Sequence, residues 1–168
     1  TVESIGSTSL IKQQDEEFIA IGSTSDEENQ RFVTFYYSPS GNHKIECTYS
    51  QSNTTYTVLK SQDVIGGLNF TKEPIHSSTI ILNLLTWVDG TNNEPRKINI
   101  ESGILANDST FDTKEVAYEY PLSFSEISLI KPPPAIPPII KKEYKSGAIN
   151  LIRYESFEFA FQFIYNNN

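Results

Sequence analysis

Residues 157–165 constrain the fold more than any other stretch of the chain, because an aromatic residue stands at every second position. In an extended strand, residues two apart point to the same face, whereas a helix would spread them around its circumference. Each ring buries on the order of 150–250 Å² when it is covered. The pattern predicts a strand with one aromatic face that the rest of the chain covers. The residues on this face are Phe157, Phe159, Phe161, Phe163 and Tyr165.

Short segments rich in aromatic and β-branched residues recur along the chain, separated by turn residues. The clearest hairpin is predicted where residues 31–38 lead through the turn 39–42 into the alternating stretch 43–50. Strand and helix patterns do not alternate, which disfavours a parallel sheet. The sequence predicts an all-β fold, a single antiparallel two-sheet sandwich of jelly-roll or Ig-like type with little helix. Further strands are expected at residues 55–60, 97–100 and 115–120.

Residues 79–88 form the most apolar run, and two interpretations remain open for it. Ile80, Ile81, Leu84, Leu85 and Val88 would line one face of a helix. The run is short and rich in residues that prefer strands, and its neighbours all resemble strands. The strand interpretation is therefore preferred over the helix.

The two ends of the chain suggest how it is organised. Residues 1–14 form a predicted N-terminal arm, and residues 15–168 form the β-sandwich domain. The arm contains Gly and a Ser-Thr-Ser run, so it is a weak strand on its own. We expect the arm to add as a strand to a neighbouring subunit, and an ordinary first strand in its own sheet is the alternative. The residues expected to fill the neighbour's groove are Val2, Ile5, Leu10 and Ile11.

Prolines at positions 132–134 and 137–138 exclude regular strand pairing there and predict a stiff polyproline-like bridge. A ligand for a proline-recognising domain is the alternative reading of this stretch. The chain contains no Met, not even at position 1, which suggests that Thr1 follows a processing event.

Charge and composition exclude several classes of partner. The chain has 13 basic and 21 acidic residues, a net charge of −8, and lacks the basic clusters that bind phosphates, so nucleic acid is not expected. No apolar run is long enough for a membrane-spanning helix. Cys47 is the lone cysteine, which rules out an internal disulfide, and its place in an alternating strand predicts a buried small hydrophobe.

The sequence contains no recognisable catalytic or metal-binding motif. His43 and His76 stand in or beside predicted turns without a companion ligand, so both are expected at the surface. Oxygen-rich loops at 89–94 and 107–112 suit calcium by composition but lack the spacing of an EF-hand. Neither a metal nor a cofactor is therefore predicted.

Three Asn-x-Ser/Thr sequons begin at Asn53, Asn69 and Asn107. Such sequons are acceptors for N-glycosylation in exported proteins. They are compatible with an extracellular location or one on a cell or particle surface.

These observations lead to three hypotheses of function. The first is a non-enzymatic structural or adhesive subunit of an extracellular assembly, such as a surface filament, an appendage or a coat or capsid-like layer. Its partners are other copies of the chain or neighbouring coat subunits. The alternative is a glycan-binding module that uses Tyr36, Tyr37 and Trp87, although the apolar surroundings of Trp87 predict a core position. An enzyme comes third, and it requires a deep pocket with a carboxylate pair or His43.

Overall fold

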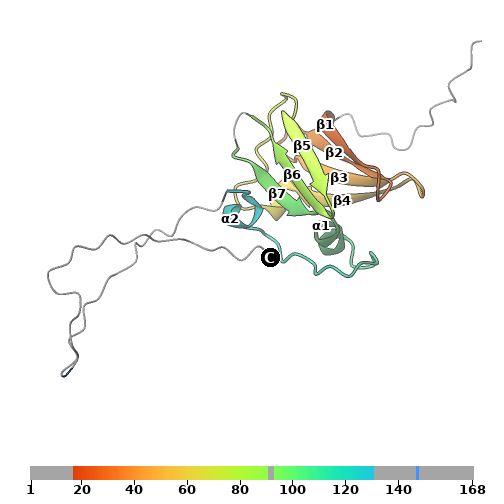
Figure 1. Cartoon of the computed structure of the whole chain (residues 1–168). Helices are drawn as coiled ribbons and strands as arrows, with labels where there is room; N and C mark the ends of the chain where they lie inside the picture. Colours follow the sequence, from red (N-terminus) through yellow and green to blue (C-terminus); the bar gives the residue numbers. More distant parts are fainter. Residues whose placement is uncertain (1–16, 91–92, 131–146, 148–168) are drawn as a thin grey trace, which may run out of the picture. The chain divides into compact units, whose positions relative to one another are not determined.

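The computed structural model describes residues 17–90, 93–130 and 147. This part of the chain forms two antiparallel sheets with little helix, which confirms the all-β class. The first sheet has the strand order β1-β2-β3-β4, with bounds Ile19–Asp26, Arg31–Tyr37, Lys44–Tyr49 and Thr54–Lys60. The second has the order β5-β6-β7, with bounds Ser77–Ile81, Leu84–Val88 and Arg96–Asn99. The helical segments are a 3-10 turn η1 (Ser61–Asp63) and two helices labelled in Figure 1, α1 (Ile100–Asn107) and α2 (Phe124–Ile127).

The predicted hairpin is formed by β2 and β3, which pair so that Val33 lies opposite Cys47 and Phe35 opposite Ile45. All four of these side chains are fully buried. The alternation of the sequence therefore fixes both the pairing register and the inward face, as expected for a sheet with one buried side. Strands β4 and β7 also stand where the sequence predicts them.

The apolar run at residues 79–88 is strand rather than helix, but it belongs to two strands instead of one. β5 and β6 pair as a hairpin with Ile81 opposite Leu84, and only Leu82 and Asn83 lie between them. Leu82 has a φ of 56°, a left-handed conformation that is uncommon for a bulky residue. Neither Gly nor Pro marks this turn, so it was not predicted from the residue types.

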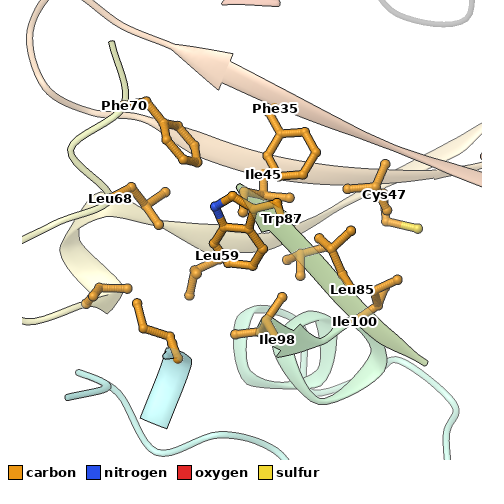
Figure 2. Close-up of a cluster of buried hydrophobic side chains, with 14 of the residues drawn as sticks. Phe35, Ile45, Cys47, Leu59, Leu68, Phe70, Leu85, Trp87, Ile98 and Ile100 are labelled. Atoms are coloured by element: carbon orange, nitrogen blue, oxygen red, sulfur yellow. The ribbon is translucent and has the colours of Figure 1, made fainter. Parts of the chain in front are cut away.

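Buried residues of both sheets belong to one hydrophobic core (Figure 2). The rings of Phe35 on β2 and Trp87 on β6 lie 5.9 Å apart, and Trp87 is only 2% exposed, as its apolar surroundings predict. Cys47 is also in this core, and burial raises the pKa of its thiol to about 12. The thiol is therefore protonated at neutral pH and acts as a small hydrophobe.

Helix α1 was not predicted and follows β7 directly. The side-chain oxygen of Asn99 accepts a hydrogen bond from the Ser102 amide at 3.1 Å and caps the helix. Ile100 and Ile104, one helical turn apart, are fully buried. Gly103, a poor helix former, lies between them and weakens the helical pattern in the sequence.

Residues 115–120 were expected to form a strand, and this prediction is wrong: the segment is irregular. Its tyrosines bond to neighbouring elements instead of forming a ladder. The Tyr118 hydroxyl accepts a hydrogen bond from the Asn99 amide at 3.0 Å, and the Tyr120 hydroxyl donates one to the Val58 carbonyl at 3.1 Å. The two tyrosine hydroxyls therefore provide hydrogen-bond partners for a backbone amide just before α1 and for a backbone carbonyl on β4.

The prediction that His43 lies at the surface is also wrong, because the side chain is only 6% exposed. Its ring stacks on Tyr37 with centroids 5.3 Å apart, and Nδ1 accepts a hydrogen bond from the Ser38 amide at 3.1 Å. Burial lowers the pKa of His43, which favours the neutral ring that this bond requires. His76 is exposed, as predicted.

Several predictions concern residues that the structure does not describe. The N-terminal arm, the proline-rich bridge and the aromatic strand at 157–165 all lie outside the described residues. The chain divides into two units, of which the first is residues 1–130. Except for Gly147, all described residues belong to this first unit. None of the helices in the described residues has the length and apolar character needed to cross a membrane.

The close approach of α1 to β4 predicts that Gly103→Ala destabilises the protein. A Cβ at this position would lie 2.5 Å from the Val58 carbonyl oxygen and 3.0 Å from Val58 Cγ1. We expect the free energy of unfolding to fall by about 1–3 kcal/mol in urea denaturation. Ala106→Gly in the same helix is the control, and it should cost about 1 kcal/mol through helix propensity. A Gly103→Ala variant more stable than wild type would show that helix propensity governs this position and not the contact.

Candidate functional site

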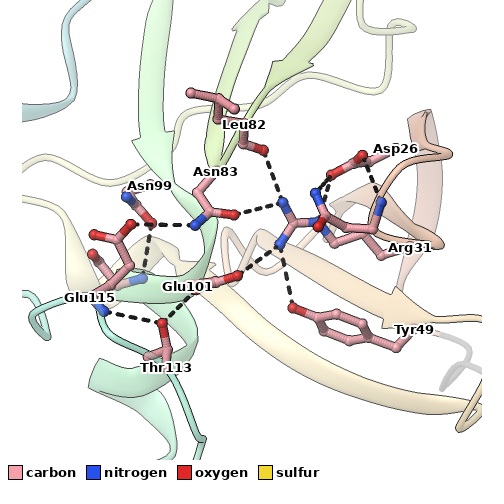
Figure 3. Close-up of polar contacts among 11 residues, drawn as sticks. Asp26, Arg31, Tyr49, Leu82, Asn83, Asn99, Glu101, Thr113 and Glu115 are labelled. Carbon is pink, nitrogen blue, oxygen red and sulfur yellow. Dashed lines mark hydrogen bonds and ion pairs between the residues drawn. The ribbon is translucent and has the colours of Figure 1, made fainter.

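A buried arginine lies at the start of β2, at one end of the two sheets (Figure 3). Arg31 is 2% exposed, and its Nε donates to the Asp26 carboxylate at 2.8 Å, across the turn between β1 and β2. Its Nη1 donates to the Tyr49 hydroxyl on β3 at 3.3 Å. Burial disfavours the guanidinium charge, but the bonds to Tyr49 and Asp26 outweigh it and raise the pKa of Arg31. The arginine is therefore charged and held at several atoms.

The same guanidinium reaches the second sheet and α1. Its Nη2 donates to the Leu82 carbonyl at 3.0 Å and to the Asn83 side-chain oxygen at 2.9 Å, so it fixes the turn between β5 and β6. Its Nη1 lies 3.6 Å from the Glu101 carboxylate in the first turn of α1. One side chain thus connects β2, β3, the β5–β6 turn and α1 (Figure 3).

Hydrogen bonds extend this network into the segment after α1. The Asn83 amide donates to Glu115 at 3.3 Å, and the Thr113 hydroxyl donates to Glu101. The Glu115 backbone amide donates to the Thr113 hydroxyl at 3.1 Å. The irregular segment around residue 113 is therefore held against both the hairpin turn and the helix.

A pocket of about 350 Å³ opens beside this network. One wall consists of three half-buried rings: Tyr49 from β3, Tyr56 from β4 and Phe111 from the segment after α1. The centroids of Tyr56 and Phe111 lie 5.1 Å apart at 66°, and those of Tyr49 and Tyr56 lie 5.9 Å apart at 84°. These rings touch one another, so together they form one continuous aromatic wall.

Polar groups surround this wall. Asn29 and Gln30 come from the β1–β2 turn, and Gln51 and Ser52 come from the β3–β4 turn. Side-chain amides both donate and accept hydrogen bonds, so they can pair with hydroxyl groups of a ligand. The carboxylates of Glu101 and Asp112 complete the lining, in which the described residues include no Lys, Arg or His. The pocket thus offers an apolar surface edged by neutral and negative polar groups.

The residues predicted as a glycan platform do not form one surface. Trp87 is buried in the core, and Tyr36 and Tyr37 are neighbours on a strand and point to opposite faces. Tyr36 lies 6.4 Å from the Phe18 ring, whereas Tyr37 stacks on His43. These residues therefore occupy three separate environments.

The three sequons also differ in their surroundings. Asn53 is exposed in the β3–β4 turn, directly after Ser52 of the pocket lining. Asn69 is exposed, and its amide donates to the Gly66 carbonyl at 2.8 Å. The Asn107 amide is half-buried and donates to the Gly103 carbonyl at 3.0 Å and to the Val58 carbonyl at 3.4 Å. Asn53 is therefore the sequon best placed to carry a glycan in this fold.

The structure gives no support for calcium in the predicted loops. Asp89 is buried, and the Asn93 amide donates to its carboxylate. Among residues 17–90 and 93–130, no group of three or more His, Cys, Asp or Glu side chains could hold a metal ion. The candidate arm residues Val2, Ile5, Leu10 and Ile11 lie outside the described residues.

Sequence reasoning missed the pocket because its lining comes from two turns, two strands, helix α1 and the segment after it, some of which are far apart along the chain. The alternation of β3 places Tyr49 on the inner face, but nothing local shows that this position stands at an open end. Gln51 in the β3–β4 turn and Tyr56 on β4 are close in the sequence, which is the one local signal for this site. Phe111 carries no sequence signal, since it follows an unpredicted helix.

Comparison with models of known protein families, with curated proteins and with solved structures finds no match for this chain.

The contacts of Arg31 predict that Arg31→Met strongly destabilises the fold. The substitution keeps a long aliphatic side chain but removes the guanidinium, so Asp26, Glu101 and the Leu82 carbonyl lose their cationic partner. We expect the free energy of unfolding to fall by about 3–5 kcal/mol in urea denaturation. Tyr49→Phe is the matched control, because it removes a single hydrogen bond and should cost about 1 kcal/mol. Equal stability of Arg31→Met and wild type would refute the role given to this network.

Proposed function

We propose that this chain is a non-enzymatic adhesive β domain of an extracellular or particle-surface assembly, and that it binds a glycan beside Arg31. In this proposal the two sheets form a sandwich of jelly-roll or Ig-like type, with the binding site at one end. The observation that carries the proposal is the pocket itself, where an aromatic wall is edged by amides and carboxylates. This glycan site replaces the platform of Tyr36, Tyr37 and Trp87.

The chemistry of the pocket suits a sugar ring. A pyranose has apolar C–H faces that pack on aromatic rings, and Tyr49, Tyr56 and Phe111 provide such a surface. Its hydroxyl groups both donate and accept, which matches the amides of Gln30 and Gln51. The volume of about 350 Å³ falls in the range typical of small-ligand sites. Binding residues are commonly carried by turns on a rigid scaffold, as here.

The carboxylates of the pocket favour binding over catalysis. Glu101 contacts Arg31 and accepts a hydrogen bond from Thr113, so its two oxygens are engaged within the protein. Asp112 is exposed on the segment after α1. His43, the other group that the enzyme hypothesis invoked, is buried and does not line the pocket.

Self-assembly through the β5–β6 turn is a second candidate function. Ile81, Leu82 and Leu84 are 64%, 78% and 37% exposed, although all three are large and apolar. Arg31 holds the backbone of this turn, so the apolar side chains are presented in a fixed arrangement. Contact with another copy of the chain or with a neighbouring coat subunit would remove them from water.

The glycan proposal predicts binding that depends on the aromatic wall. On a glycan array, protein made in a host without N-glycosylation should bind a defined subset of oligosaccharides. Phe111→Ala should weaken that binding about 10-fold in calorimetry, because it removes one ring of the wall. Phe124→Ala is the control, since Phe124 is 46% exposed and does not line the pocket.

Two results would contradict the proposal. The first is the absence of binding to every glycan on the array. The second is release of cleaved sugar from a bound oligosaccharide, which would make the chain an enzyme with Glu101 and Asp112 as the first residues to replace.

A further inference from the structure

We infer that the pocket selects glycans that carry a protonated amino group, that is, amino sugars, over neutral and acidic ones. The inference rests on the proposed function and adds the chemical class of the ligand. Three features carry it: the sign of the charges around the pocket, the availability of Asp112 and the shape of the aromatic wall.

The charges around the pocket are predominantly negative. Among residues 17–90 and 93–130, the lining contains the carboxylates of Glu101 and Asp112 and no cationic side chain. Arg31 is the described cation in contact with this lining, and its fully buried side chain lies 2.8 Å from Asp26 and 3.6 Å from Glu101. Lys114, two residues after Asp112, is exposed and does not line the pocket. The positive charge of Arg31 and the negative charges of Asp26, Glu101 and Asp112 add up to a net charge of −2 for these four side chains. The net charge of −8 on the whole chain has the same sign, so carboxylated or sulfated sugars are repelled.

Asp112 supplies a carboxylate that a ligand can reach. It is exposed, and it has no hydrogen-bond or ion-pair partner in the part of the chain that the structure describes. Glu101 differs, because Arg31 and Thr113 already hold it. The side chain of Asp112 is thus the one in the lining that can pair with an ammonium group without breaking an internal contact.

The aromatic wall attracts cations and also limits their shape. Aromatic ring faces carry negative π density, and because Arg31 already lies 6.0 Å from the Tyr49 centroid, Tyr56 and Phe111 are the two rings of the wall left to attract a ligand cation. The three centroids lie 5.1, 5.9 and 6.2 Å apart, so the rings touch and no cation fits between them. The wall is therefore a surface for a ring that bears an ammonium group and not a closed cage for an isolated one. The surrounding amides pair with the hydroxyl groups of such a ring.

The inference is tested by calorimetric titration of the full chain at mildly acidic pH, where sugar amines are protonated. The ligands are a glucosamine oligomer, the N-acetylglucosamine oligomer of equal length and a sialylated oligosaccharide. The glucosamine oligomer should bind tightest, and added salt should weaken its binding. Asp112→Asn should reduce that affinity about 2- to 5-fold and leave the affinity for the acetylated oligomer unchanged. Glu73→Gln, which removes an exposed carboxylate outside the pocket, should change neither.

The other outcomes separate this inference from the proposed function. If the glucosamine and N-acetylglucosamine oligomers bound equally, or if the sialylated oligosaccharide bound tighter, the selection for amino sugars would be overturned and the glycan site would remain. Binding of tetramethylammonium as tight as that of the glucosamine oligomer would overturn it in favour of a site for the cation alone. Binding of none of these ligands would overturn the inference together with the proposed function.

Discussion

Arg31 places a full positive charge in the interior at the point where β2, the β5–β6 turn and α1 meet. Removing a charge from water is costly, and the structure compensates with carboxylate, carbonyl, amide and hydroxyl partners around the guanidinium. The apolar core supplies the larger share of the driving force, but apolar contacts carry little directional information. The arginine supplies this directional information, because each of its N–H groups needs an acceptor at a defined position on a neighbouring element.

The pocket depends on the same contacts. The Tyr49 hydroxyl accepts a hydrogen bond from Arg31, and the Tyr49 ring is part of the aromatic wall. Glu101 contacts the guanidinium and also lines the pocket. Thr113 bonds to Glu101 and so ties the segment that carries Phe111 to the helix. The lining of the pocket is therefore supported by groups that are themselves held in place. Such support is what a site made largely from turns requires.

The parts of the fold that the sequence predicts are those with a local cause. Alternating apolar residues fix the β2–β3 hairpin, because the two-residue period places Phe35 and Ile45 on one face. The turn at Leu82 has no such local cause: its backbone is left-handed without a Gly, and its carbonyl accepts a hydrogen bond from the distant Arg31. Residues 115–120 show the period of a strand without being one, because their tyrosines bond to other elements. The pocket was unpredictable for the same reason: contacts between segments far apart in the chain create it.

We propose that one end of the two sheets, organised by Arg31, is the binding site of this protein. The most direct test is nuclear magnetic resonance during titration with a glucosamine oligomer, observing backbone amides and the Nε–H of Arg31. The account predicts that the signals which shift belong to the pocket lining and to Arg31, whose Nε donates to Asp26. Shifts centred on Tyr36 and Lys44, on the outer face of the first sheet, or no shifts at all, would contradict it.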